Sequence, residues 1–272
     1  MIKQAIIPLA GLGTRLLPLT SVIPKELLPI NGKPNLEYII EECVEAGVKE
    51  FIFIISKNKM SIKKYFFNDT FYNKIIKKKK DKRIIDEFRK IKKYQKMIKF
   101  VYQNKPKGTG DAVLKCEKLI KSKFFLMLLP DDLIINNNCS KEMIKLHLRT
   151  NGSVIATKRV DKKTVSRWGI LSFKNKKKNF FQINGVIEKP KIRNAPSNYA
   201  IIGRYILPFE IFKEIKKLKP GQGKEIHITD AIRNLILKRN KFFGNIFKGK
   251  YLDCGTINGY IQSSIEIFKG KS

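Results

Sequence analysis

An apolar segment that stops abruptly at small residues, near the start of the chain, limits the possible folds most. Ile6-Ile7-Pro8-Leu9 leads directly into Ala10-Gly11-Leu12-Gly13-Thr14-Arg15. Continuous apolar runs of this length are typical of strands buried on both faces. Gly11 and Gly13 allow a sharp turn and a close approach of the backbone to a ligand, because no Cβ intervenes. This pattern predicts an α/β fold with a ligand site at the carboxyl end of its first strand.

The charged residues around this loop indicate a polyphosphate ligand. Backbone N–H groups in a glycine turn suit anionic oxygens, Arg15 can contact two phosphate oxygens at once, and Lys25 adds a second positive charge. Two common phosphate motifs do not fit. A P-loop needs Lys-Ser or Lys-Thr after its last glycine, where this chain has Thr14-Arg15, and the dinucleotide fingerprint needs a third glycine, where this chain has Leu16. For Gly-x-Gly alone, an ordinary strand-to-helix turn is the alternative.

Length and composition indicate a globular protein. The chain has 272 residues, 43% of them hydrophobic, which is enough for a sizeable core in one large α/β domain or two small ones. No apolar run approaches the roughly 20 residues that span a bilayer, and the N-terminus shows no signal-peptide pattern. We therefore expect a cytoplasmic protein without a membrane partner. The four cysteines are far apart in sequence, and we expect most of them to be buried thiols of a reducing compartment.

A net charge of +34 has two interpretations. It is typical of proteins that bind nucleic acid or anionic membranes, and residues 60–97 combine many lysines with aromatic residues, Phe71 and Tyr72 among them. The alternative is a genome-wide bias toward lysine, with residues 60–97 forming amphipathic helices whose aromatic side chains pack on a sheet. Lysines are spread along the whole chain, so we favour the second interpretation and expect no specific nucleic-acid partner.

Apolar periodicity predicts alternating strands and helices along the chain. The first half is predicted to contain strands at 4–9, 51–55, 98–103 and 124–129 and helices at 34–46, 108–120 and 140–149, with Ser140 as an N-cap. The second half is predicted to contain strands at 153–159, 169–173, 181–188 and 199–207, helices at 209–217 and 229–239, a strand-like stretch at 241–254, and a last helix near Thr256. We expect a mostly parallel central sheet within a single domain, residues 1–272.

Two further clusters suggest ligand contacts. The amide of Gln103 offers a donor and an acceptor together, which suits the edge of a pyrimidine, and Gly108 lets a base lie close to the backbone. Asp131 and Asp132 end a buried strand, and Asp253 lies in a similar setting. Carboxylates there suit a hard cation such as Mg²⁺, which binds carboxylate and phosphate oxygens together. A strand-helix turn and an Asp-rich turn are the plainer alternatives.

Several motifs in a fixed order resemble the sugar-nucleotide pyrophosphorylases. Gly11-x-Gly-Thr-Arg15 is followed by Pro24-Lys25-Glu-Leu-Leu-Pro29, a form similar to that of bacterial UTP–glucose-1-phosphate uridylyltransferases. Further matching elements are Gln103 with Gly108, Leu129-Pro-Asp131, Trp168-Gly169, Gly185-Val-Ile-Glu188-Lys189-Pro190, the segment around Gly203, and Asp253-Cys-Gly255. Thr109 and Asp111 depart from the pattern, because relatives often carry Leu and His there.

The resemblance implies a role for each matching residue. Ala10, Gly11, Gly13, Thr14 and Arg15 would bind the nucleotide phosphates, and Gln103 and Gly108 the base. Gly169, Glu188, Lys189 and Gly203 would bind the sugar phosphate, with Asp131 and Asp253 holding Mg²⁺. Arg15, Lys25 and Lys189 would act in catalysis.

The resemblance also implies a fold, a reaction and an assembly. The fold would be a Rossmann-like three-layer nucleotidyltransferase fold, with the nucleotide in about residues 1–150 and the sugar in about 151–272. The reaction would join UTP and glucose 1-phosphate to give UDP-glucose and pyrophosphate in a dimer or tetramer. A thymidylyltransferase and a basic nucleic-acid-binding protein are the alternatives.

Overall fold

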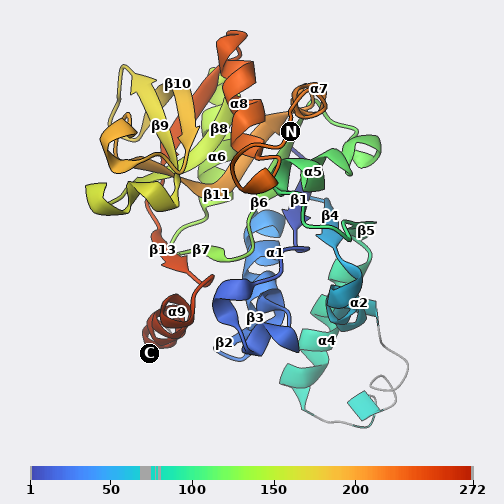
Figure 1. Ribbon diagram of the computed structural model, residues 1–272. Coiled ribbons are helices and arrows are strands. Elements are labelled where there is room, and N and C mark those ends of the chain that lie inside the picture. Colours follow the sequence, from blue (N-terminus) through green and yellow to red (C-terminus); the bar gives the residue numbers. More distant parts are fainter. Residues whose placement is uncertain (1, 68–74, 77, 79–80, 271–272) are drawn as a thin grey trace.

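The apolar runs of the sequence form one nine-stranded sheet. The structure is a computed structural model that describes residues 2–67, 75–76, 78 and 81–270. The strands lie in the order β5-β4-β1-β6-β11-β8-β12-β10-β9 (Figure 1). In chain order they are β1 (Gln4–Pro8), β4 (Glu50–Ile55), β5 (Ile98–Tyr102), β6 (Phe124–Leu128), β8 (Ser153–Arg159), β9 (Gly169–Lys174), β10 (Phe180–Glu188), β11 (Tyr199–Pro208) and β12 (Phe242–Ile246).

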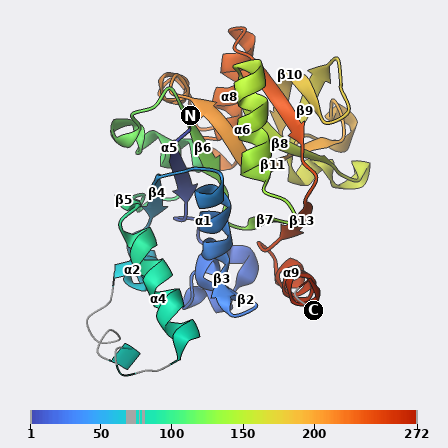
Figure 2. The same cartoon turned by 180° about the vertical axis from the view of Figure 1, so that it is seen from behind.

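Helices cover both faces of this sheet, which explains why its strands β1, β4, β6 and β11 are largely apolar. Successive side chains of a strand point to opposite faces, so Ile7 packs into one core and Ile6 into the other. The first core includes residues of α1 (Asn35–Glu45), α2 (Met60–Phe67), α4 (Lys82–Gln95) and α6 (Cys139–Thr150). The second includes residues of α5 (Thr109–Leu114), α7 (Ile211–Ile215) and α8 (Ile228–Leu237). The two opposite views show α8 in front of the sheet and α6 behind it (Figures 1 and 2).

The sheet is mixed, so the expectation of a mostly parallel sheet is not confirmed. Pairs β1–β4, β1–β6, β4–β5 and β8–β12 are parallel. However, β11 runs antiparallel to β6 and β8, and β10 runs antiparallel to β9 and β12. The connection between β9 and β10 is too short for a crossover, and a short connection reverses the chain. The positions of the strands along the sequence were correctly predicted, but the relative directions of the strands depend on the lengths of the connections between them.

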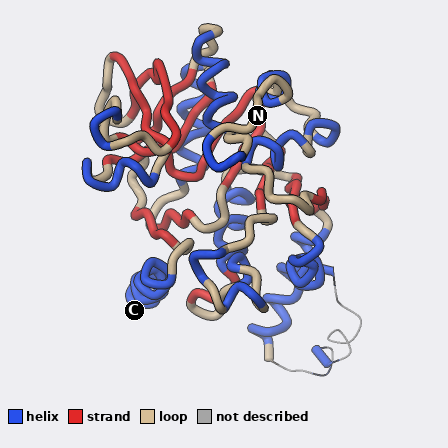
Figure 3. The backbone as a smooth tube through the Cα atoms, viewed as in Figure 1, coloured by secondary structure: helices blue, strands red, loops and turns tan. Residues whose placement is uncertain are grey.

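Two small sheets lie beside the main one. The strand β7 (Asp132–Ile135) pairs antiparallel with β13 (Lys250–Asp253), which places Asp132 opposite Asp253. The strands β2 (Pro29–Ile30) and β3 (Lys33–Pro34) form the second, next to α9 (Ile257–Lys269). These short strands separate from the main sheet in the backbone trace (Figure 3). The pairing of β7 with β13 therefore brings the segment of Asp132 next to the segment of Asp253, about 120 positions later in the sequence.

Several predicted boundaries need correction. The N-cap of α6 is Asn138, whose side chain accepts a hydrogen bond from the Lys141 N–H at 2.9 Å. Ser140 was therefore wrongly predicted as the cap, and its hydroxyl donates to Glu42 instead. Pro34 belongs to β3, so α1 begins one residue later. The predicted helix at 108–120 is two shorter helical segments, at Thr109–Leu114 and Glu117–Leu119.

The expected last helix and buried cysteines are confirmed. The helix α9 begins directly after Thr256, which is its N-cap, and all four cysteines are free and buried. Phe66 and Tyr94, from the lysine-rich stretch, pack into the core, whereas Phe71 and Tyr72 lie outside the described residues. Among the helices that the structure describes, none combines the length and apolarity that crossing a membrane requires.

Candidate active site

Every site residue that we predicted from the sequence lines one cavity of about 850 Å³. The cavity lies where β1 and β6 end and where the segments around β9, β10 and β11 meet them. The nominated residues in its wall are Ala10, Gly11, Gly13, Thr14, Arg15, Lys25, Gln103, Gly108, Asp131, Gly169, Glu188, Lys189, Gly203 and Asp253. The structure brings these residues together, and their individual roles stay predictions.

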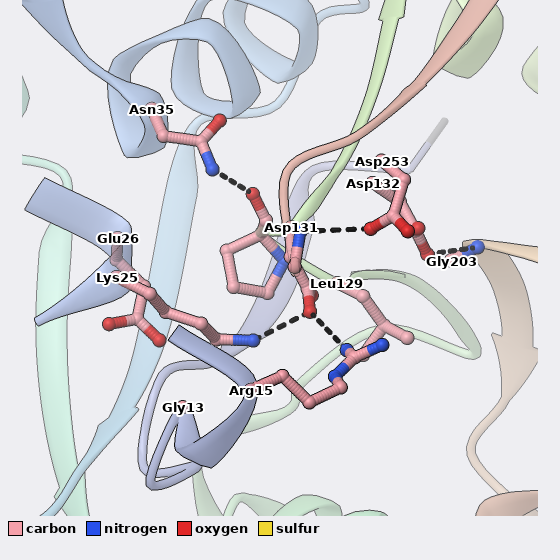
Figure 4. A network of polar contacts seen from close by, with 12 residues as sticks. Gly13, Arg15, Lys25, Glu26, Asn35, Leu129, Asp131, Asp132, Gly203 and Asp253 are labelled. Carbon is pink, nitrogen blue, oxygen red and sulfur yellow. Dashed lines mark hydrogen bonds and ion pairs between the residues drawn. The ribbon is translucent and has the colours of Figure 1, made fainter. Parts of the chain in front are cut away.

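Asp131 is the centre of the charged part of the cavity. Lys25 Nζ lies 2.6 Å from Asp131 Oδ2, and an Arg15 nitrogen lies 3.5 Å from the same oxygen (Figure 4). Burial alone disfavours both charged forms, but each is stabilised by its partner. The net result is a raised pKa for Lys25 and a lowered pKa for Asp131. The pair is therefore ionised, with the lysine directed at the carboxylate.

The carboxylate of Asp253 approaches that of Asp131 beside Gly255. An ideal Cβ built on Gly255 would lie 2.8 Å from Asp131 Oδ2 and 3.2 Å from Asp253 Oδ1. A larger residue at this position would fill the space between the two carboxylates. The backbone N–H of Gly255 donates to Asp253 Oδ1 at 2.8 Å, and Cys254 N–H donates to the Asp131 carbonyl at 2.8 Å. These bonds fix both aspartate segments around one space.

This donor set fits Mg²⁺ shared with a substrate. Over residues 2–67, 75–76, 78 and 81–270, no group of three or more His, Cys, Asp or Glu side chains is placed to hold a metal ion. Mg²⁺ commonly takes one or two carboxylates and completes its shell with water and substrate phosphates. Two converging carboxylates are therefore sufficient ligands from the protein when the substrate is a phosphate.

Asp132, next in the chain, has a structural role. Its carboxylate accepts hydrogen bonds from the Gly203 N–H at 3.0 Å and from the Tyr251 hydroxyl at 2.7 Å. Burial and the neighbouring Asp131 raise the pKa of Asp132 to about 6. A Cβ on Gly203 would lie 2.4 Å from this carboxylate, so only glycine fits at that position in β11. The Asp132 carboxylate thus ties β11 and β13 to the turn that carries Asp131.

The predicted base-binding residues form a turn with a defined amide orientation. Gln103 Nε2 donates to Asp111 Oδ2 at 2.7 Å and to the Gly108 carbonyl at 3.2 Å. Gly108 has a φ of +97°, and a Cβ there would lie 2.5 Å from the Ile226 carbonyl oxygen. Asp111 therefore holds the Gln103 amide, leaving the amide oxygen as the group that can accept from a ligand.

The predicted sugar-binding residues surround the end of β10. Glu188 Oε2 accepts a hydrogen bond from the Thr229 hydroxyl at 3.0 Å, and a Cβ on Gly169 would lie 3.2 Å from the same oxygen. Lys189 has a φ of +43°, a conformation that L-residues rarely adopt, and its N–H donates to the Trp168 carbonyl at 2.9 Å. Lys189 is thus held in a strained backbone conformation at the cavity wall, where its Nζ lies 3.8 Å from Glu188 Oε1.

Sequence reasoning missed two buried ion pairs that support the site. Lys59 Nζ lies 2.8 Å from each carboxylate oxygen of Glu26, the residue that follows Lys25 in the chain. Arg204, fully buried in β11, lies 2.9 Å from Glu42 on α1. An Arg204 nitrogen also donates to the Leu129 carbonyl at 3.1 Å, close to Asp131. A charged residue among apolar neighbours in the sequence, such as Glu42 beside Cys43, indicates a buried ion pair. A single sequence does not reveal which residue is its partner.

Comparison with known proteins identifies the family. Residues 4–269 match the nucleotidyl transferase family, and the chain belongs to that family. It is 38% identical over 274 residues to UTP–glucose-1-phosphate uridylyltransferase 2 of Streptococcus pyogenes serotype M3, covering 97% of this chain and 90% of that protein.

Two solved structures of UDP-glucose pyrophosphorylase have the same fold. The structure complexed with UDP-glucose is 38% identical, with a TM-score of 0.88 and coverage of 99% of this chain and 100% of the other. The apo structure is 37% identical, with a TM-score of 0.91 and full coverage of both chains. The mixed α/β architecture is thus that of a nucleotidyltransferase.

Proposed function

We propose that this chain is a UTP–glucose-1-phosphate uridylyltransferase, which joins UTP and glucose 1-phosphate to give UDP-glucose and pyrophosphate. The observation that carries the proposal is the convergence of an anion-binding loop, two carboxylates and a sugar-phosphate segment on one cavity. The names of the full-length relatives support the same activity. Residues 1–150 contribute the nucleotide side, residues 151–272 contribute the sugar side, and both belong to one domain.

The reaction needs positioning more than proton transfer. The phosphate oxygen of glucose 1-phosphate is already an anion, so it can attack the α-phosphorus of UTP in line without a general base. The residues therefore act by orienting two anionic substrates and neutralising their charge. The Gly11–Thr14 backbone and Arg15 hold the β- and γ-phosphates, and Arg15 stabilises the departing pyrophosphate.

Charge neutralisation at the reacting centre is assigned to a lysine on each side. Lys25 lies beside Asp131 at the nucleotide side, and Lys189 follows Glu188 at the sugar side. Glu188 accepts hydrogen bonds from sugar hydroxyls, while Gln103 and Gly108 contact the base. Mg²⁺ held by Asp131 and Asp253 would supply Lewis-acid neutralisation of the phosphate oxygens when bound.

Pyrophosphate release tests this assignment. Purified protein is incubated with Mg²⁺, glucose 1-phosphate and one nucleoside triphosphate at a time. Release with UTP well above dTTP is the expected result, and removal of Mg²⁺ with a chelator should abolish it. A preference for dTTP would make the chain a thymidylyltransferase with the same mechanism. Absence of release with every triphosphate would contradict the enzyme assignment and favour the nucleic-acid-binding alternative.

We also propose that the protein is a homo-oligomer, a dimer or tetramer. Ile257, Ile261 and Ile265 recur every four residues along α9 and are 41–47% exposed. Residues at this spacing form one apolar stripe on a helix, and such stripes are usually covered by another surface. Light scattering should give a mass above one chain, and Ile261→Lys should lower that mass. A wild-type mass of one chain would contradict the proposal.

A further inference from the structure

We propose that a second cavity, on the opposite face of the sheet from the candidate active site, binds a small phosphorylated polyhydroxy compound, the chemical class of a sugar phosphate. This cavity has a volume of about 460 Å³. It lies between α6 and the segments around the start of β10 and the end of β12, and six of its lining residues carry the argument: Glu142, Lys145, Arg149, Phe180, Asn245 and Lys248. In the described part of the chain, the linings of the two cavities have no residue in common.

Two buried polar atoms in the wall of this cavity have no partner. In the part of the chain that the structure describes, Nδ2 of Asn245 and Oε1 of Glu142 make no hydrogen bond. Asn245 is only 6% exposed. Burying a polar group without a partner is costly, so such groups usually have a ligand or a water as their partner. Asn245 Nδ2 can donate a hydrogen bond and Glu142 Oε1 can accept one, and hydroxyl groups of a ligand can satisfy either atom.

Three positively charged side chains line the same cavity. Lys145 and Arg149 follow Glu142 on α6 by three and seven positions, which places all three on one helix face. Lys248 follows β12, so three cations and one carboxylate line this cavity. Cations of this density suit a phosphate group. The two buried polar atoms suit hydroxyl groups and the cations suit a phosphate, so together they indicate a ligand that carries both hydroxyl and phosphate groups.

An aromatic ring completes the wall. The Arg149 guanidinium lies 4.5 Å from the centre of the Phe180 ring, which holds this long side chain over the ring by a cation–π contact. Phe180 is partly buried and also packs against Phe243 of β12. A fixed guanidinium and an apolar ring edge suit the phosphate and the carbon skeleton of a sugar phosphate, respectively.

Calorimetric titration with glucose 6-phosphate tests the proposal. The phosphate of this probe is not on the anomeric carbon, so it cannot replace glucose 1-phosphate in the proposed reaction. Binding should persist when the protein is saturated with UDP-glucose, which occupies the catalytic cavity. Lys145→Ala and Asn245→Leu should each raise Kd at least about tenfold, the effect of losing one good polar contact. Lys141→Ala is the matched control, since Lys141 is exposed on the same helix and does not line the cavity.

Each other result would overturn the proposal. No heat with glucose 6-phosphate would mean that the cavity holds only water. Competition by UDP-glucose would place the binding in the catalytic cavity, and equal affinity for inorganic phosphate would remove the role of the hydroxyl pair. An equal loss in Lys141→Ala would show nonspecific attraction to the lysine-rich surface. A separate titration with UDP-glucose alone reports whether the proposed function fails, so the two failures are distinguishable.

Discussion

Lys25 Nζ lies 2.6 Å from Asp131 Oδ2, so the carboxylate that we assign to Mg²⁺ is paired with a lysine in the free protein. Both groups line the cavity and both are largely buried. Binding of Mg²⁺ and a triphosphate would replace this partner of Asp131 and leave the ammonium of Lys25 facing phosphate oxygens. The ion pair thus holds both charges at the cavity wall, where each would meet the ligand that we propose for it.

Asp131→Ala should lower kcat at least about 100-fold, because it removes one strong electrostatic contact at the reacting phosphates. Steady-state pyrophosphate release measures this loss. Asp86→Ala is the control, since Asp86 is exposed on α4 and pairs only with Arg89 among the described residues. Near-normal turnover in purified Asp131→Ala would contradict the assignment of Asp131.

Lys189→Gly should separate stability from activity. A lysine at a φ of +43° is strained, and glycine adopts this conformation without a Cβ penalty. We expect the free energy of unfolding to stay equal or rise by up to about 1 kcal/mol, while kcat falls at least about 100-fold. Urea unfolding and pyrophosphate release are measured on the same preparation. A fully active variant would show that the lysine side chain has no role at the sugar phosphate.

Gly11→Ala should leave the fold intact and weaken nucleotide binding. An ideal Cβ on Gly11 meets no heavy atom within 4 Å in the free protein, so it fits in the absence of ligand. It would occupy the space of a phosphate that approaches the backbone, and KM for UTP should rise at least about tenfold.

Gly108→Ala provides the contrast to Gly11→Ala, because its Cβ would clash with the Ile226 carbonyl and reduce stability itself. Thermal unfolding compared with KM for UTP distinguishes the two effects. An unchanged KM in Gly11→Ala would argue against phosphate binding by this loop.

The buried pair of Arg204 and Glu42 should be costly to break. Arg204→Met leaves a buried carboxylate without its main cation, a change that typically costs about 3–5 kcal/mol. The double variant with Glu42→Gln should lose less than the sum of the two single losses, because no uncompensated charge remains. A double-mutant cycle in urea measures the coupling, and additive losses would show that the two side chains stabilise the fold independently.

Glu50 should contribute to the loss of stability in acid. Burial opposes its ionisation, but hydrogen bonds from Lys99 at 2.6 Å and Gln4 at 2.7 Å outweigh burial and lower the pKa of Glu50. Its stabilisation is therefore present above the unfolded pKa near 4.5 and is lost as pH falls through the lower folded value.

Glu50→Gln should reduce stability by about 0.5–1 kcal/mol near neutral pH and leave it unchanged in strong acid, where both proteins are uncharged at this position. Urea midpoints at both pH values measure the difference. A constant difference at every pH would exclude a titrating contribution from Glu50.

Local sequence patterns predicted most strands and helices, but not the contacts between residues far apart in sequence. The Gly11 loop and the Gln103–Gly108 turn follow strands of the α/β pattern, whereas Glu188 and Lys189 were assigned to the site only through the resemblance. All of these residues line one cavity. The direction of β11 and β10 depends on connection lengths that strand propensity does not encode. The cap at Asn138 was missed because Ser140, an equally suitable cap by type, donates to Glu42 in another helix. The Arg204–Glu42 pair joins residues 162 positions apart, which a single sequence cannot reveal.

The most direct test of the central claim follows the phosphorus atoms of UTP. Protein, Mg²⁺ and glucose 1-phosphate are incubated with UTP that carries ³²P at either the α- or the γ-position, and the products are separated by chromatography. Attack at the α-phosphorus predicts that the α-label appears in UDP-glucose and the γ-label in pyrophosphate. Release of the γ-label as inorganic phosphate, or an α-label that stays in UTP, would contradict the account.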